Sequence, residues 1–251
     1  MKSTQQIFDA YSSYYNLLYD DKDYVGEANY IQTLLTRQGV SKGDLLEFGS
    51  GTGKHGRLLA ERGYCVHGVE SSAAMVAQAL TIDGFTCQQG DICGVQLGRT
   101  FDAVLSLFHV ISYQTSNAAL MAVFARAAEH LCTGGLFLFD FWYSPAVYAQ
   151  RPSVRVKRMS DREVEIIRIA EPVPYPQESR VDVKYTIFAR DLANEAVQIT
   201  TETHPMRHFS LPEIDLLAVV HGFERIYAEE ILSRKPPGED TWGVCVTLKK
   251  I

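Results

Sequence analysis

The residues best suited to chemistry lie in a glycine-rich stretch near the start of the chain, LLEFGSGTGKHG at residues 45–56. Gly49, Gly51 and Gly53 alternate directly after a short apolar run. Glycine reaches positive φ at little steric cost and lets a ligand approach the backbone. A helix that begins at about Lys54 would add free N–H groups at its N-terminus. The stretch therefore predicts a loop that holds a ligand against its main chain.

Three acidic residues end short segments around this loop. Glu47 precedes the glycines, Glu70 ends VHGVE, and Asp91 follows QQG. Glu70 is placed to bind ribose hydroxyls, and Asp91 can accept a hydrogen bond from an adenine amino group. Glu47 can help to position a sulfonium, whereas a pyrophosphate would disfavour this charge. The pattern favours S-adenosylmethionine, although residues 51–56 also match the dinucleotide fingerprint GxGxxG.

The elements that must position these residues alternate along the first part of the chain. Apolar runs predict strands at DLLEF, CVHGVE, TCQQGD, FDAVLSLF and GLFLFDF, with helical segments between them. Such alternation is typical of a parallel sheet covered on both faces. Two helices are expected over residues 7–38.

The pattern changes after residue 150. Alternating β-branched segments predict an antiparallel meander with one wet face, and the three prolines of EPVPYPQES predict an irregular connection. The segment LPEIDLLAVVHG then predicts a helix, and FERIYAEEIL and WGVCVTLKK predict strands that close the main sheet. We expect a helical cap (1–40), an α/β core (41–148), an antiparallel β insertion (149–206), and a C-terminal helix with strands (207–251).

The ordered set LLEFGSGTGKHGRLLAERG, VHGVESSAAMVAQA, QQGDI, FDAVLSLFHVISY and AEHLCTGGLFLFDFW resembles class I S-adenosylmethionine-dependent methyltransferases. A narrower set, which includes DAYSSYYNLLYDDKDYVGEANYI, is similar to N,N-dimethyltransferases of nucleotide-linked deoxyamino sugars. The resemblance implies a doubly wound, mostly parallel Rossmann-like methyltransferase sheet with an N-terminal helical lid and an antiparallel β insertion after the fifth strand. It also implies that Tyr19 and Tyr24 lie over the cofactor and that the insertion shapes the acceptor site.

The predicted cofactor site combines the loop, the acidic residues, the lid tyrosines and their neighbours. Its residues are Tyr19, Tyr24, Glu47, Phe48, Gly49, Ser50, Gly51, Gly53, His55, Glu70, Ser71, Met75, Gly90, Asp91, Ile92, Leu107 and Phe108. Phe108 could stack beside adenine or belong to the core. Tyr11, Tyr14 and Tyr15 are expected to pack as an amphipathic stripe instead.

The acceptor is expected near the ends of the fourth and fifth strands. His109 is the best candidate general base because it titrates near neutrality, although it could also pack beside adenine without a proton role. Tyr19 is a second candidate catalytic residue. The predicted acceptor-binding residues are Tyr113, Trp142, Tyr143, Arg207 and His208. The last two could meet an anionic group or form a solvated strand end.

Composition narrows the function classes further. The 251 residues carry a formal net charge of −6, which argues against a nucleic acid polymer as partner. Five cysteines without a CxxC pair favour a reducing cytoplasm and no structural zinc. We expect no metal and no membrane span, and the insertion could pair two subunits as a homodimer.

We therefore expect methyl transfer from S-adenosylmethionine to a small polar acceptor, first the amino group of a nucleotide-linked sugar. O-methylation of a sugar or another small metabolite is the alternative. An NAD-type oxidoreductase is a more remote one, and a methyltransferase-like fold that serves as a non-catalytic subunit also stays open.

Overall fold

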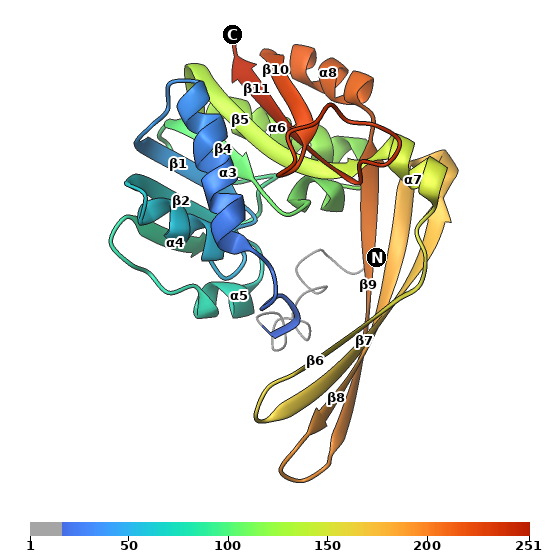
Figure 1. The fold of residues 1–251 in the computed structure, drawn as a ribbon. Helices are drawn as coiled ribbons and strands as arrows, with labels where there is room; N and C mark the ends of the chain where they lie inside the picture. The colour runs from blue at the N-terminus through green and yellow to red at the C-terminus, as the bar shows by residue number, and fades with distance from the viewer. Residues whose placement is uncertain (1–16) are drawn as a thin grey trace.

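The computed structural model describes residues 17–251, so most of the first expected helix, with Tyr11, Tyr14 and Tyr15, lies outside the described residues. A mostly parallel sheet forms the core, with the strand order β3-β2-β1-β4-β5-β11-β10 (Figure 1). Strand β11 runs antiparallel to both of its neighbours. The strands are β1 (Gly43–Phe48), β2 (Tyr64–Glu70), β3 (Phe85–Gln89), β4 (Phe101–Ser106), β5 (Leu131–Tyr143), β10 (Phe223–Glu230) and β11 (Gly243–Lys250). This sheet confirms the predicted fold class.

Helices cover both faces of the sheet, as the alternation of strands and helices predicts. The helices of the described residues are α3 (Tyr24–Arg37), α4 (Lys54–Ala60), α5 (Ala73–Gln78), α6 (Asn117–Glu129), α7 (Ser144–Gln150) and α8 (Leu211–Val220), with the 3₁₀ helices η1 (Val110–Tyr113) and η2 (Pro176–Glu178). Of these, η2 lies within the insertion, between its second and third strands. Ser72, Ser116 and Ser210 each cap a helix by accepting a backbone N–H three residues later. None of the helices in residues 17–251 is long and apolar enough to cross a membrane.

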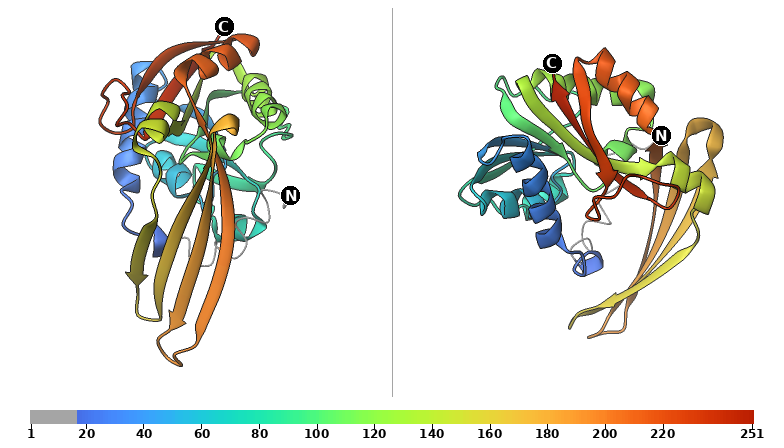
Figure 2. Two further views of the ribbon diagram at one scale, coloured as in Figure 1. Left: turned by 90° about the vertical axis from the view of Figure 1, so that its right-hand side faces the viewer. Right: turned by 45° about the horizontal axis from the view of Figure 1, so that its top comes forward.

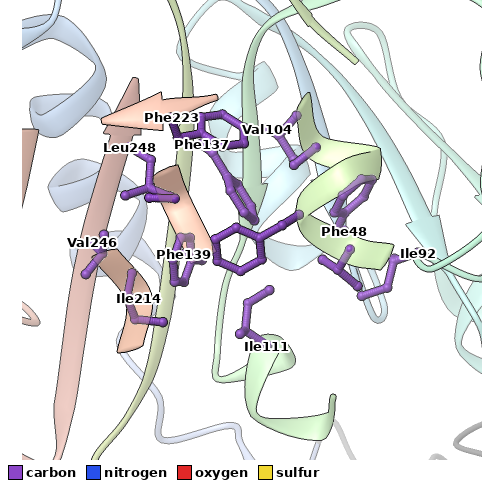
Figure 3. Packing of buried hydrophobic residues seen from close by; sticks show 14 of the residues in the cluster. Phe48, Ile92, Val104, Ile111, Phe137, Phe139, Ile214, Phe223, Val246 and Leu248 are labelled. Carbon is purple, nitrogen blue, oxygen red and sulfur yellow. The ribbon is translucent and has the colours of Figure 1, made fainter. Parts of the chain in front are cut away.

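Successive residues of the central strands pack into two separate hydrophobic layers, one on each face, because side chains alternate across a sheet. Phe137 and Phe139 of β5 pack with α6 and α8 on one face, a cluster shown in Figure 3. Leu136 and Leu138 pack with α3 and α4 on the other face. Both faces of β5 are therefore buried, and a ligand site can form only at the ends of the strands.

A second sheet carries the segment between α7 and α8. Strands β6 (Arg155–Ser160), β7 (Val164–Tyr175), β8 (Arg180–Asp191) and β9 (Val197–Phe209) pair antiparallel in chain order. They project from the core as a long curved sheet in both views of Figure 2. Strand β9 joins the core by pairing parallel with the end of β5, Trp142 with His208 and Tyr143 with Phe209.

The expected irregular structure across the proline-rich segment is wrong. Pro172 and Pro174 lie within β7, opposite Val183 and Val181 of β8. Strand β6 pairs with β7 only as far as Ala170, so beyond that residue β7 is an edge strand. A proline on an edge can direct its missing N–H away from the ladder, which is why the strand continues.

Candidate functional site

A cavity of about 480 Å³ opens at the carboxyl ends of the parallel strands, where open α/β sheets usually bind ligands. The β insertion supplies part of its wall. The predicted site residues that line it are Tyr19, Tyr24, Gly49, Ser50, Gly51, His55, Glu70, Ser71, Met75, Asp91, Ile92, Leu107, Phe108, His109, Tyr113 and Trp142. The structure thus brings most of the predicted cofactor and acceptor residues to one cavity.

The glycine loop follows β1 and leads into α4. Gly49, Gly51 and Gly53 all have positive φ, at +70°, +55° and +76°. An added Cβ on Gly49 or Gly53 would approach a neighbouring side chain to 2.6 Å or less, so these two glycines are required by packing. An added Cβ on Gly51 would meet nothing nearer than the Met75 sulfur at 3.9 Å. Gly51 is therefore the position where a ligand can approach the backbone.

Glu70 fixes this loop from the end of β2. One carboxylate oxygen accepts the Gly51 N–H at 2.9 Å, and the other accepts the Ser72 N–H at 2.8 Å. The side chain is buried and also lines the cavity. Asp91 accepts the Cys93 N–H at 2.9 Å, so its backbone turn holds it at the cavity rim.

Phe108 and His109 follow β4 in consecutive left-handed conformations, with φ of +63° and +62°. Such backbone strain in residues other than glycine is costly and clusters at functional sites. Asp140 of β5 holds this turn, because its Oδ2 accepts the His109 N–H at 2.9 Å. The same oxygen lies 2.6 Å from His109 Nδ1, out of line for a straight hydrogen bond. The buried carboxylate therefore fixes both the backbone and the ring of His109.

The residues before and within α3 form one side of the cavity. The Tyr19 ring meets Phe108 edge-on with ring centroids 5.1 Å apart, and Lys22 Nζ lies over the Phe108 ring at 3.9 Å. Tyr24 packs against His55 with centroids 5.1 Å apart. Tyr19 and Tyr24 therefore make this side of the cavity aromatic, while Lys22 is paired with Glu27 and stands outside the lining.

The wall that holds the predicted acceptor residues Tyr113 and Trp142 combines the core with the insertion. Tyr113 of η1 lies 2.9 Å, hydroxyl to Nδ1, from His204 of β9, and Tyr185 of β8 meets His204 edge-on at 4.9 Å. Met206 and Trp142 complete this wall. Tyr185, His204 and Met206 come from the insertion, so the second sheet shapes the cavity directly.

Glu47 lies beneath the glycine loop and outside the cavity wall. Glu47 is buried, with only 1% of its surface exposed. Its carboxylate oxygen Oε2 would lie only 2.9 Å from a Cβ added to Gly56. Burial and the negative charge of Glu70 raise the pKa of Glu47 to about 8. Phe48, Gly53, Gly90 and Tyr143 also stand outside the cavity lining. The loop therefore rests on a carboxyl group that is protonated at neutral pH.

The predicted anion contacts at Arg207 and His208 do not reach the cavity wall. Arg207 alternates to the opposite face of β9 from His204 and pairs with Glu213 at 2.6 Å. His208 shares the inner face but bonds Ser144 at 2.8 Å. Burial and the charge of Arg207 lower the pKa of His208 to about 4, so His208 carries no positive charge at neutral pH.

Several cavity residues were missed by sequence reasoning. They are Thr52, Lys54, Cys93, Val110, Gln114, Ala119, Tyr185, His204 and Met206. The alternation of β9 contained a signal, because His204 and Met206 share one face of the strand, whereas Arg207 lies on the other. Which face turns inward depends on how the insertion packs on the core.

The site residues fit S-adenosylmethionine. The volume lies within the range of small-molecule pockets. Gly51 borders the cavity with little beside it, and the carboxylates of Glu70 and Asp91 line the same cavity, where they could accept hydrogen bonds from a ribose and an adenine. No group of three or more potential metal ligands occurs in the part of the chain that the structure describes.

Comparisons with known proteins point the same way. A family model described as a methyltransferase domain matches residues 45–135. A dTDP-3-amino-3,4,6-trideoxy-alpha-D-glucopyranose N,N-dimethyltransferase of Streptomyces venezuelae is 32% identical over 219 residues, which cover 86% of this chain and 90% of the relative. A dTDP-3-amino-3,6-dideoxy-alpha-D-glucopyranose N,N-dimethyltransferase of Streptomyces fradiae is 29% identical and covers 68% of this chain and 67% of its own.

Solved structures share the fold. The sugar N-methyltransferase KedS8 from Streptoalloteichus sp ATCC 53650 aligns with a TM-score of 0.81 at 21% identity, over 100% of this chain and 96% of its own. CalS10, an amino pentose methyltransferase from Micromonospora echinaspora solved with S-adenosylmethionine bound, aligns with a TM-score of 0.77 at 22% identity, over 97% and 98%. The chain therefore belongs to the family of S-adenosylmethionine-dependent methyltransferases that contains the Streptomyces N,N-dimethyltransferases.

Proposed function

We propose that this enzyme methylates the amino group of a nucleotide-linked deoxyamino sugar. The observation that carries the proposal is a single cavity that joins the glycine loop to the inner face of the β insertion. Relatives that cover most of the chain are named for N,N-dimethylation of dTDP-linked amino sugars, which supports an amino acceptor over a hydroxyl.

In this proposal the loop side of the cavity holds the cofactor. The Gly49–Gly51 backbone borders the methionine portion, Glu70 accepts hydrogen bonds from the ribose, and Asp91 accepts one from the adenine amino group. Met75 and Phe108 provide the apolar contacts. Tyr19 and Tyr24 close the site and exclude water, since their rings suit a cation. When bound, S-adenosylmethionine supplies a methyl group on an already activated sulfur leaving group.

The remaining residues orient the acceptor and remove a proton. A neutral amine needs positioning more than strong base catalysis, because its lone pair is the nucleophile. Asp140 occupies the Nδ1 side of His109, so Nε2 is the nitrogen that takes the proton from the acceptor ammonium. Trp142 borders the sugar, and its ring meets His109 at 6.3 Å between centroids.

The test is an activity assay with dTDP-linked 3-amino and 4-amino sugars, read by the mass of the product. We expect added methyl groups on amino sugars and none on dTDP-glucose, which presents hydroxyl groups alone. Methylation of dTDP-glucose with no reaction of the amino sugars would replace the proposal with O-methylation.

We further propose a homodimer that covers the outer face of the insertion. Val156 of β6, Val173 of β7 and Ile199 of β9 are exposed there, and the strand register places them on the face opposite His204. Apolar faces of this kind commonly mark protein interfaces. Light scattering should give the mass of a dimer, and a monomer at micromolar concentration would contradict the pairing.

The free cysteines support a cytoplasmic enzyme. The acidic net charge supports a small-molecule acceptor over a nucleic acid polymer.

A further inference from the structure

A chain of three polar side chains runs from the cavity into the insertion. The Tyr113 hydroxyl lies 2.9 Å from His204 Nδ1, and His204 Nε2 lies 3.3 Å from Glu202 Oε2. The side chains of His204 and Glu202 are only 2% and 9% exposed. Tyr113 belongs to η1 of the core, whereas the other two belong to β9. The contact between Tyr113 and His204 therefore links η1 of the core to β9 of the insertion.

The chemistry of Glu202 and Tyr113 decides which atom donates each hydrogen bond to or from His204. A carboxylate only accepts hydrogen bonds, so the proton between Glu202 and His204 belongs to Nε2 of the ring. A neutral imidazole protonated at Nε2 presents a lone pair at Nδ1, which accepts the Tyr113 O–H. Burial raises the pKa of Tyr113 well above its usual value, so the hydroxyl keeps its proton to donate. A phenol oxygen that donates in this way can still accept a hydrogen bond.

Neighbouring residues of the insertion pack against the His204 ring and hold it in place. Tyr185 meets the His204 ring edge-on at 4.9 Å, and Arg168 lies over the Tyr185 ring at 5.1 Å. Strand register places Glu202 opposite Tyr185 on the inner face of the insertion. Among the residues that the structure describes, the charged or titratable groups that face His204 include Tyr113 from η1, Tyr185 from β8 and Glu202 from its own strand, with Arg168 of β7 behind Tyr185.

We propose that Tyr113 accepts a hydrogen bond from the acceptor's N–H, and that the buried His204–Glu202 pair is the positioning device that fixes the direction of the Tyr113 oxygen. The inference rests on the proposed function, because it names how that site recognises an amino group. Holding an N–H bond of a neutral amine fixes the direction of its lone pair. A correctly directed lone pair is the main requirement for in-line methyl transfer.

The proposal gives separate roles to His109 and His204, two of the three histidines that line the cavity. His109 is anchored by Asp140 within the core, and His204 is anchored by Glu202 within the insertion. Substitution of His204 or Glu202 should therefore impair orientation of the acceptor and leave the glycine loop unchanged.

The test compares Tyr113→Phe, His204→Leu, Glu202→Ala and Glu202→Gln in steady-state kinetics with a dTDP-amino sugar. Tyr113→Phe and His204→Leu should lower kcat/KM for the acceptor by about tenfold or more, the usual effect of a lost buried hydrogen bond. Glu202→Gln should recover most of the activity that Glu202→Ala loses, because its amide oxygen still accepts from Nε2. Affinity for S-adenosylhomocysteine should not change in any of them.

Tyr148→Phe is the matched control. Tyr148 meets His208 of the same strand edge-on at 5.0 Å but stands outside the cavity lining, so it should retain wild-type kcat/KM. Equal losses in Tyr113→Phe and Tyr148→Phe, or wild-type kinetics in Tyr113→Phe, would overturn the proposal.

A second measurement determines which ring nitrogen of His204 carries the proton, and it needs no acceptor. Nitrogen NMR of the ring in the wild-type complex with S-adenosylhomocysteine should show His204 protonated at Nε2 and not at Nδ1. Protonation at Nδ1 would overturn the proposed chain of donors. If the wild type methylates no amino sugar, the proposed function fails by itself, and the NMR result still decides whether Tyr113 donates to His204.

Discussion

Gly51 offers the sharpest test of the cofactor loop, because substitution there separates backbone strain from contact with a ligand. Its φ is +55°, and an added Cβ would have only the Met75 sulfur within 4 Å, at 3.9 Å. A left-handed conformation costs other residues about 1–2 kcal/mol, and a protein of this size loses about 2–4 °C in Tm per kcal/mol. Gly51→Ala should therefore fold, with its Tm lowered by about 2–8 °C.

The same methyl group would occupy space that we assign to the cofactor. The Gly51 N–H bond to Glu70 survives in alanine, so a loss of binding would come from the added carbon. We expect the affinity for S-adenosylhomocysteine to fall by at least about tenfold, or about 1.4 kcal/mol. Calorimetric titration measures this change directly.

Gly98→Ala is the matched control for strain. Gly98 has φ of +65°, no atom within 4 Å of an added Cβ, and no place in the cavity lining. It should show a similar fall in Tm with unchanged affinity for S-adenosylhomocysteine. If Gly51→Ala binds as tightly as Gly98→Ala, the assignment of the loop is refuted.

Three further outcomes are expected. Burial raises the pKa of Glu47 from 4.5 to about 8. Between these values the folded protein holds the Glu47 proton that the unfolded chain has lost, so the contribution of Glu47 to wild-type stability falls as pH rises. The stability of Glu47→Gln relative to wild type should grow by about 1.4 kcal/mol per pH unit from 4.5 to 8, and parallel Tm profiles would contradict this. Arg207→Ala should cost about 1–2 kcal/mol in urea unfolding through loss of its Glu213 pair, with an unchanged KM for the acceptor; a large rise in that KM would show a direct anion contact. Asp140→Asn should lower kcat by about 10²-fold at unchanged cofactor affinity, because His109 loses its charged anchor, and an undiminished kcat would contradict a role of the Asp140 charge in supporting His109.

Local sequence determined the core of this protein and most of the glycine-loop side of its cavity. Alternating apolar runs predict the strands, and glycines that need positive φ mark the loop after β1. Glu70 ends β2 and Asp91 closely follows β3, so a parallel sheet must bring them to the same edge. These inferences hold because each depends on a few neighbouring residues and on one regular topology.

Tertiary structure alone decided which residues of the insertion line the cavity. The sequence placed Arg207 beside the acceptor, but the packing of the insertion turns His204 inward and Arg207 outward. A one-residue change of register inverts which side chains face the core, and nothing local in β9 fixes that register. Likewise, prolines predict a break in β7, yet the strand continues because β6 ends and leaves an edge. Contacts between residues far apart in the chain, such as Tyr113 with His204, follow from how the two sheets meet and not from spacing along the sequence.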